Sequence, residues 1–152
     1  MQLDSTAFAS IKVLVVDDEH YMRKVLRALL MSIGVRTITD VPDGLAGLEA
    51  LRTMAPDLVL LDWEMPGLDG PSFVRMVRSP KTFPYPDVPI IMITGHGERS
   101  RMVEAASIGV NEFLLKPVSS KTLRDTLVAV LSKPHGADRR LPRAGAAQAH
   151  QL

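Results

Sequence analysis

The chain has 152 residues, of which 46% are hydrophobic and 23% charged, so it can bury the core of one domain of ordinary size. Its formal net charge of +1 excludes general attraction to nucleic acid or to an anionic membrane, because such binding needs a concentrated basic surface. The absence of cysteine excludes a disulfide framework, a thiolate metal site and cysteine catalysis. With no export signal and no apolar run approaching ~18 residues, we expect a soluble, cytoplasmic protein.

Short apolar runs rich in Val, Ile and Leu predict five β-strands. They lie at residues 11–16, 35–39 (the weakest run), 58–61, 88–93 and 113–115. Most of these runs are apolar at nearly every position rather than at alternate ones. Strands of this kind are buried on both faces, which is typical of a parallel sheet covered by helices.

Amphipathic helices are predicted between and after these strands. Apolar residues repeat with the spacing of one helical face at Met22, Val25, Leu26, Leu29 and Leu30. Gly34 should end this helix, and Asp69 and Ser119 are candidate N-caps of later ones. Further helical patterns lie at residues 45–51, 73–77, 102–106 and 123–131.

A strand followed by a helix, repeated five times, predicts a doubly wound, three-layer α/β fold. We place one domain at residues 10–134, preceded by an N-terminal extension at 1–9. Apolar periodicity ends near Pro134, so we expect residues 135–152 to form a flexible C-terminal tail. Three arginines of this tail could touch a phosphate or an acidic partner, but a solvated terminus is the simpler interpretation.

Polar residues fall where the predicted strands end. Asp17 and Asp18 follow the first strand, Asp62 the third, Thr94 the fourth and Lys116 the fifth. The carboxyl ends of parallel strands lie at one edge of a sheet, which is where doubly wound folds bind their ligands. Three carboxylates, a hydroxyl and an ammonium should therefore converge on a common hollow.

The chemistry of this set favours phosphoryl transfer. Three adjacent carboxylates repel one another and need a cation, for which Mg²⁺ is the expected ion because it prefers oxygen ligands. Lys116 supplies a second positive charge. Phosphoryl transfer requires positioning and charge neutralisation more than acid–base chemistry. A carboxylate such as Asp62 can serve as the nucleophile and form an acyl phosphate.

Four segments resemble the motifs of response-regulator receiver domains of the CheY-like type. They read VVDDE at 15–19, LLDWEMPGLDG at 60–70, IMITG at 91–95 and FLLKP at 113–117. Any one would be a weak signal, but four in order, each at a strand end, are specific. The resemblance covers residues 11–133 and implies a flavodoxin-like (βα)5 sandwich with a parallel sheet in the order 2-1-3-4-5.

The same resemblance implies a role for each acidic residue. Asp62 would be the phosphoacceptor. Asp18 and Asp62 would bind Mg²⁺ directly, together with the backbone carbonyl of Glu64. Asp17 would act mainly through metal-bound water.

The remaining motif residues would bind the phosphoryl group and report its arrival. Thr94 would bond one phosphoryl oxygen and Lys116 another. Phe113 matches an aromatic switch position, whose side chain turns inward as Thr94 is drawn toward the phosphate. Gly95 would leave room for the donor, and the bond from Lys116 to Pro117 is a candidate cis peptide.

Each of these residues also has a structural interpretation. Asp17 and Asp18 could cap the helix that follows them, and Thr94 could cap the helix that follows Thr94. Lys116 could extend along the sheet edge into solvent, and Phe113 could be an ordinary core residue. The co-occurrence of all of them is what favours a functional site.

The sequence allows separate predictions for Trp63, His96 and the segment at residues 79–89. We expect Trp63 to be partly exposed, so that its fluorescence would report metal binding. Histidine is a common acid–base residue, but for His96 a mobile loop residue is a better interpretation than a catalytic one. Four prolines within residues 79–89 predict a stiff, extended connection.

Glu64 lies two residues beyond the proposed acceptor, near the mouth of the site. Its carboxylate could pair with Lys116 in the resting state, or it could alter the access of water to an acyl phosphate. We expect it to tune the lifetime of the phosphoryl group rather than the identity of the acceptor.

The resemblance implies a response regulator of two-component signal transduction, phosphorylated on Asp62 by a sensor histidine kinase or a phosphotransfer protein. Output would come from altered binding to a downstream protein, by a monomer or a phosphorylation-dependent dimer. We expect no direct nucleic-acid or membrane binding. Catalysis should be limited to the protein's own phosphorylation and slow dephosphorylation.

Other functions remain open. The chain could be a phosphorelay intermediate or a phosphate sink without an effector of its own. It could also be an aspartyl-nucleophile phosphatase, since Asp62 and Glu64 partly match the Asp-x-Asp pattern of those enzymes. A receiver that acts without phosphorylation ranks lowest, because the metal and phosphate positions are all filled.

Overall fold

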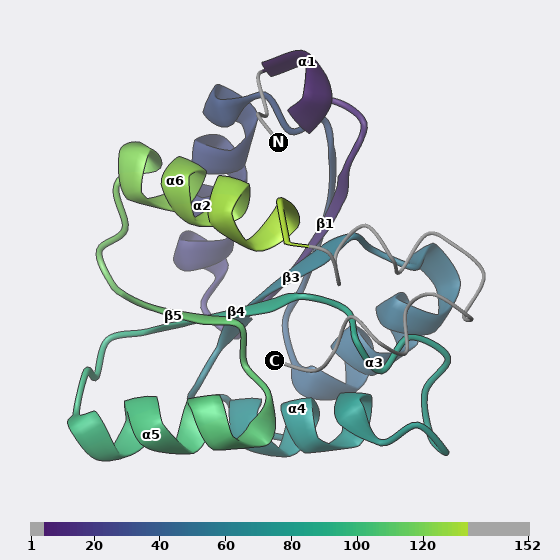
Figure 1. Ribbon diagram of the computed structural model, residues 1–152. Coiled ribbons are helices and arrows are strands. Elements are labelled where there is room, and N and C mark those ends of the chain that lie inside the picture. Colours follow the sequence, from purple (N-terminus) through teal and green to yellow (C-terminus); the bar gives the residue numbers. More distant parts are fainter. Residues whose placement is uncertain (1–4, 134–152) are drawn as a thin grey trace.

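The computed structural model describes residues 5–133, and the flexible tail predicted at 135–152 lies outside this range. Figure 1 shows a central sheet with helices on both faces. The strands are β1 (Lys12–Val16), β2 (Thr37–Val41), β3 (Leu58–Asp62), β4 (Ile90–Thr94) and β5 (Glu112–Leu115). The helices are α1 (Ser5–Phe8), α2 (His20–Ile33), α3 (Gly44–Met54), α4 (Gly70–Arg78), α5 (Arg99–Ile108) and α6 (Ser120–Leu131).

All neighbouring strands pair in parallel, and the sheet order is β2-β1-β3-β4-β5. The predicted flavodoxin-like (βα)5 fold is therefore confirmed. Because every strand runs in the same direction, all five carboxyl ends lie at one edge of the sheet. Within residues 5–133, no helix has both the length and the apolar character needed to cross a membrane.

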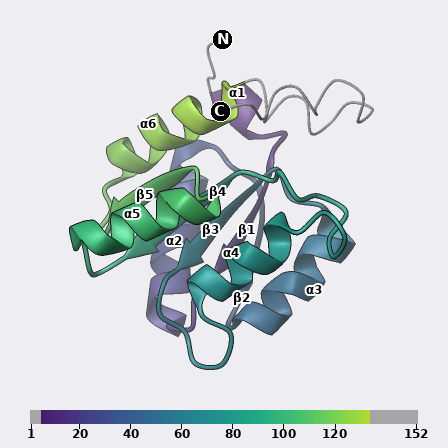
Figure 2. The ribbon, with the colours of Figure 1, turned by 60° about the horizontal axis from the view of Figure 1, so that its bottom comes forward.

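The sheet separates two apolar cores. Leu14 and Val16 of β1 belong to the core formed with α3, α4 and α5, whereas Val13 and Val15 belong to the core formed with α2 and α6. Figure 2 shows α3, α4 and α5 together on one side of the sheet. Strands β3 and β4 are buried at every position, as their continuous apolar runs predicted. Burial on both faces holds the strand ends, and so the site, in a fixed arrangement.

Phe8 extends the second core beyond the domain start that we placed at residue 10. This side chain is fully buried among residues of the α2 and α6 core. The guanidinium carbon of Arg124, on α6, lies 5.9 Å from the centre of its ring. The short helix α1 thus contributes packing, which its weak apolar pattern did not indicate.

Two predicted strand starts were early by two residues. Val35 is 1% exposed, yet its N–H donates to the carbonyl oxygen of Leu30 as part of the helix end, and β2 starts only at Thr37. Val88 is buried as well, but its N–H donates to Tyr85 before β4 begins. Both valines are apolar because they fill the core, which an apolar run alone does not distinguish from pairing in a strand.

The predicted helix boundaries are confirmed where a specific chemical group sets them. Gly34 ends α2 with φ of 122°, a backbone conformation that disfavours residues with a Cβ atom. The side chain of Asp69 accepts a hydrogen bond from the N–H of Ser72, and that of Ser119 accepts one from the N–H of Thr122.

A half-buried arginine anchors the proline-rich connection between α4 and β4. Arg78 donates hydrogen bonds to the carbonyl oxygens of Pro86, Val88 and Gly109, at 2.7–3.0 Å. Phe83, in the middle of the connection, is 4% exposed and packs into the core. These contacts hold the segment in place against the sheet.

Candidate functional site

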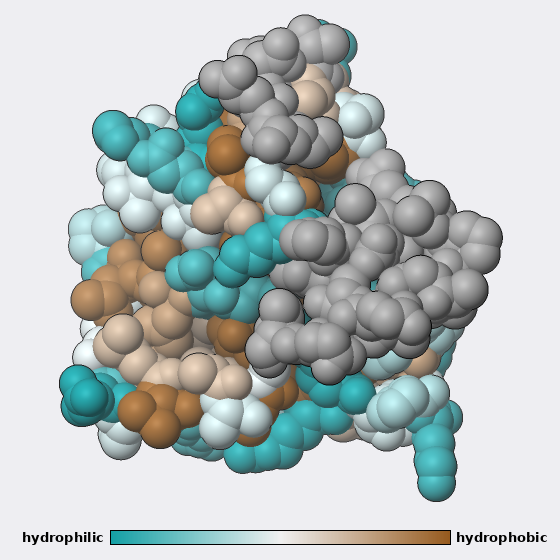
Figure 3. Space-filling model, viewed as in Figure 1, coloured by the Kyte–Doolittle hydropathy of each residue, from teal (hydrophilic) through white to brown (hydrophobic). Residues whose placement is uncertain are grey.

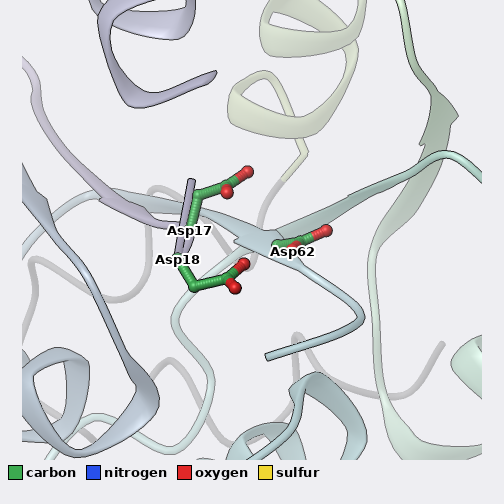
Figure 4. Close-up of side chains that lie close together, drawn as sticks. All are labelled: Asp17, Asp18 and Asp62. Atoms are coloured by element: carbon green, nitrogen blue, oxygen red, sulfur yellow. The ribbon is translucent and has the colours of Figure 1, made fainter. Parts of the chain in front are cut away.

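Three carboxylates meet at the carboxyl edge of the sheet. One ligand atom from each of Asp17, Asp18 and Asp62 lies within 4.8 Å of the others. Figure 4 shows all three side chains directed to the same side of the strand ends. Asp17 and Asp62 are buried, whereas Asp18 is exposed. The structure therefore brings together the acidic residues that the strand ends predicted.

The ammonium of Lys116 lies between two of these carboxylates. Its Nζ atom is 3.2 Å from Oδ1 of Asp62 and 3.3 Å from Oδ2 of Asp17. The N–H of Lys116 donates to the carbonyl oxygen of Thr94, which ties the end of β5 to the end of β4. The Lys116–Pro117 peptide bond is cis, as predicted. Lys116 is thus part of the cluster and does not extend into solvent.

Burial and mutual repulsion change the protonation of the cluster. Burial, followed by the charge of Asp17, raises the pKa of Asp62 from 3.8 to about 6. Burial also raises the pKa of Asp17. Burial by itself lowers the pKa of Lys116, but the charges of Asp62 and Asp17 outweigh it, so that the net pKa is raised.

The single ammonium of Lys116 cannot neutralise three carboxylates. A hard, divalent cation with oxygen ligands would supply the missing charge, and the oxygens of the three aspartates are ligands of the kind that Mg²⁺ prefers. The acidic cluster therefore fits a magnesium ion.

Neither aspartate that follows β1 caps a helix. Oδ1 of Asp17 accepts a hydrogen bond from the N–H of Glu19, at 2.9 Å, within the turn that follows the strand. Glu19 is the N-cap residue of α2 and makes no side-chain capping bond. The capping alternative for Asp17 and Asp18 is therefore wrong.

Thr94 is 1% exposed at the end of β4, and its Oγ1 accepts a hydrogen bond from the N–H of His96 at 3.2 Å. The N-cap of α5 is Glu98, so Thr94 holds the preceding loop and does not cap the helix. Its hydroxyl lies on the strand next to the one that carries Asp62.

The prediction of a partly exposed Trp63 is wrong, because this residue is 8% exposed. Its ring packs edge to face against Phe113, with centroids 6.2 Å apart, and the guanidinium carbon of Arg101 lies 4.8 Å from its centre. Phe113 itself is only half-buried. An aromatic contact thus links the residue after Asp62 to β5.

Glu64 pairs with Arg101 of α5 and with His96 just before it, and not with Lys116, which was one of the two alternatives. Its Oε2 atom is 2.7 Å from Arg101, and its Oε1 atom is 3.4 Å from Nε2 of His96. The hydrogen bond from Arg101 lowers the pKa of Glu64. His96, which we expected to be a mobile loop residue, is thus a partner of Glu64 in this structure.

Sequence reasoning missed Arg101, although one signal was available. Cations are unfavourable near the N-terminus of a helix, and Arg101 lies in the first turn of α5, three residues after the acidic N-cap Glu98. These residues border an open cleft over the acidic cluster. Its lining includes Asp18, Asp62, Trp63, Glu64, Met65, Gly95, His96, Arg101 and Lys116.

The comparisons with known proteins agree with this geometry. Residues 13–128 match the family model described as "Response regulator receiver domain". The chain is 32% identical over 124 residues to chemotaxis protein CheY-3 of Vibrio cholerae, covering 82% of this chain and 94% of that protein. It is 36% identical over 121 residues to CheY1 of Helicobacter pylori, covering 79% and 96%.

A solved structure of CheY4 of Vibrio cholerae superposes with a TM-score of 0.72 at 30% identity, covering 80% of this chain and 98% of that one. The parallel sheet, the acidic cluster at its carboxyl edge and the match over residues 13–128 agree, and the chain therefore belongs to the response regulator receiver domain family.

Proposed function

We propose that this receiver domain accepts a phosphoryl group on Asp62 from a phosphohistidine of a partner kinase or phosphotransfer protein. The observation that carries the proposal is the position of the Asp62 carboxylate, buried at the end of β3 and open to the cleft between Lys116 and two further carboxylates. A carboxylate oxygen at that point can attack phosphorus and form an acyl phosphate.

Magnesium is the proposed cofactor. Asp18 and Asp62 would hold it directly, with the backbone carbonyl of Glu64, and Asp17 would act through bound water. When bound, Mg²⁺ neutralises carboxylate and phosphoryl oxygens and so lowers the cost of bringing an anionic donor to an anionic site.

Phosphoryl binding is assigned to Lys116 and Thr94. The ammonium of Lys116 already lies 3.2 Å from the Asp62 oxygen and can pair with a phosphoryl oxygen attached there. Movement of the Thr94 hydroxyl toward the phosphate would free space beside β5, and Phe113 would turn inward to fill it. Its present half-buried position against Trp63 is consistent with a resting conformation.

The output would be a change in binding to a downstream protein. Met102 and Val103 of α5 and Leu115 of β5 are exposed apolar side chains near this switch region. Figure 3 shows apolar residues gathered on the side of the molecule where α5 and β5 lie. A shift of β5 and α5 after phosphorylation would alter this surface.

The phosphatase alternative needs Glu64 as a free acid–base. Both of its carboxylate oxygens face cationic or titratable partners on or before α5, and its lowered pKa keeps it ionised. This arrangement favours a receiver over an aspartyl-nucleophile phosphatase.

The test is loading of the protein with acetyl phosphate in the presence of Mg²⁺, followed by intact mass spectrometry. We expect a gain of one phosphoryl group that requires Mg²⁺ and is absent from Asp62→Asn. Asp57→Asn is the matched control. Asp57 is a buried aspartate of the loop between α3 and β3, so its replacement should not alter loading. No gain with acetyl phosphate or a second small donor, phosphoramidate, would overturn the proposal.

Replacing Glu64 by Asn should change the kinetics of the same reaction. It removes a negative charge from the mouth of the cleft while leaving Arg101, so we expect loading by anionic donors to become about 3- to 10-fold faster. The lifetime of the phosphoryl group should change as well. Glu98→Gln, which removes a weaker partner of Arg101 at 3.7 Å, is the control. Unchanged loading and decay would contradict a kinetic role for Glu64.

A further inference from the structure

Arg23 connects the end of β1 with β2 beneath the acidic cluster. It lies in the first turn of α2, and its side chain is 13% exposed. One guanidinium nitrogen, NH1, donates to the backbone carbonyl oxygen of Asp17 at 2.7 Å. Its Nε atom lies 3.3 Å from Oδ2 of Asp40, on β2.

The Asp17 carbonyl accepts this bond outside the hydrogen bonds of the sheet. It lies one residue beyond β1, and so outside the run of residues that pair in the strand. A buried carbonyl without a partner would cost about 1–3 kcal/mol. The same carbonyl belongs to the peptide group that joins Asp17 to Asp18. Fixing its direction therefore fixes the point from which the Asp18 side chain departs.

Every other polar group of Asp17 that could set this turn is also engaged. Its N–H donates to the carbonyl oxygen of Val41 at 3.2 Å, and its Oδ1 accepts from the N–H of Glu19 at 2.9 Å. Its Oδ2 accepts from the ammonium of Lys116 at 3.3 Å, whereas the Arg23 bond brings a side chain of another element to the backbone carbonyl. It ties the turn to α2, whereas Asp40 ties Arg23 to β2.

We propose that Arg23 is a positioning residue of the metal site, holding the peptide between Asp17 and Asp18 so that both carboxylates face Asp62. This inference rests on the proposed function, because it assigns Mg²⁺ to the cluster. Partners of metal ligands commonly affect affinity in this way, since they fix ligand orientation without contacting the ion.

The neighbouring Arg27 provides a matched control. Its NH2 atom lies 2.6 Å from Oδ1 of Asp40 and donates to the carbonyl oxygen of Ile38 at 3.0 Å. The two arginines share Asp40 as an anionic partner, but of the two it is Arg23 that bonds to Asp17. If weakening the contact between α2 and β2 affects Mg²⁺ binding in general, variants of both arginines should bind Mg²⁺ more weakly. If Arg23 positions the metal ligands, only the Arg23 variant should do so.

The experiment compares Mg²⁺ binding to the full chain for wild type, Arg23→Met and Arg27→Met by isothermal titration calorimetry. Methionine keeps an apolar stem and removes the donors. We expect Arg23→Met to bind Mg²⁺ about 10- to 100-fold more weakly, and Arg27→Met to stay within about 3-fold of wild type. Arg23→Lys, which restores a single cationic donor, should recover part of the affinity.

Urea unfolding verifies that each variant is folded, and Arg23→Gln replaces Arg23→Met if the latter is not. A folded Arg23→Met or Arg23→Gln with wild-type affinity would overturn the positioning role and leave the proposed function intact. Equal losses of Mg²⁺ affinity in the Arg23 and Arg27 variants would also overturn the positioning role. If wild type itself fails to bind Mg²⁺, the proposed function and this inference fail together.

Discussion

Asp62→Asn is expected to raise the free energy of unfolding by about 3 kcal/mol above pH 7 when Mg²⁺ is removed with EDTA. Burial raises the pKa of Asp62 from 3.8 to about 6. Between these values the folded protein retains a proton that the unfolded chain has lost, so the stability of wild type falls as the pH rises from about 4 to 6. Asparagine does not ionise and escapes this loss.

The measurement is urea unfolding followed by circular dichroism between pH 4 and 8. The advantage of Asp62→Asn should be small near pH 4, grow through pH 5–6 and stay constant above pH 7. Asp125→Asn is the control, since its exposed carboxylate has a pKa lowered by Lys121 and should show no gain at high pH. Equal stabilities of Asp62→Asn and wild type at pH 8 in EDTA would contradict the shifted pKa of Asp62. Saturating Mg²⁺ should stabilise wild type and remove the difference.

Lys116→Met should lower the free energy of unfolding by about 3 kcal/mol at pH 8, again in EDTA. Lys116 is 3.2–3.3 Å from oxygens of Asp62 and Asp17, and the three side chains are only 16%, 8% and 2% exposed, respectively. Removing the ammonium leaves two buried carboxylates facing each other without a cation. The loss should shrink below pH 5, where Asp62 is protonated in the folded state.

Mg²⁺ binding distinguishes two roles for Lys116. The lysine and the metal neutralise the same carboxylates, so Lys116→Met should bind Mg²⁺ more tightly than wild type although its apo form is less stable. Lys121→Met is the control, because its pair with Asp125 is exposed and should contribute little to stability. Weaker Mg²⁺ binding by Lys116→Met would show that the lysine organises the site rather than competing with the metal.

The residues that meet at the strand ends could be predicted from the sequence for a simple physical reason. Strands buried on both faces are continuously apolar, so the first polar residue after each marks the sheet edge. Asp17, Asp62 and Lys116 could therefore be grouped before any contact was known, and the structure places them together. Val35 and Val88 mark the limit of this reasoning, since apolar residues also fill the core outside strands.

Only the tertiary structure decided which partners the long side chains around the cluster contact. Arg23, Glu64 and Arg101 each have several rotatable bonds, and their sequence positions do not specify which partner they reach. Glu64 could have turned to Lys116, but the first turn of α5 places Arg101 within 2.7 Å of it. Trp63 is buried because Phe113 and Arg101 cover it from β5 and α5.

The sequence by itself thus determined the alternation of strands and helices and the set of residues at the acidic edge, because both follow from local patterns repeated along a parallel sheet. The strand order was implied by the resemblance to receiver domains. The partners that orient this set come from elements far apart in the chain. Arg23, for example, meets Asp17 and Asp40 only after β1, β2 and α2 have packed together. Such contacts depend on packing geometry, which no local pattern encodes.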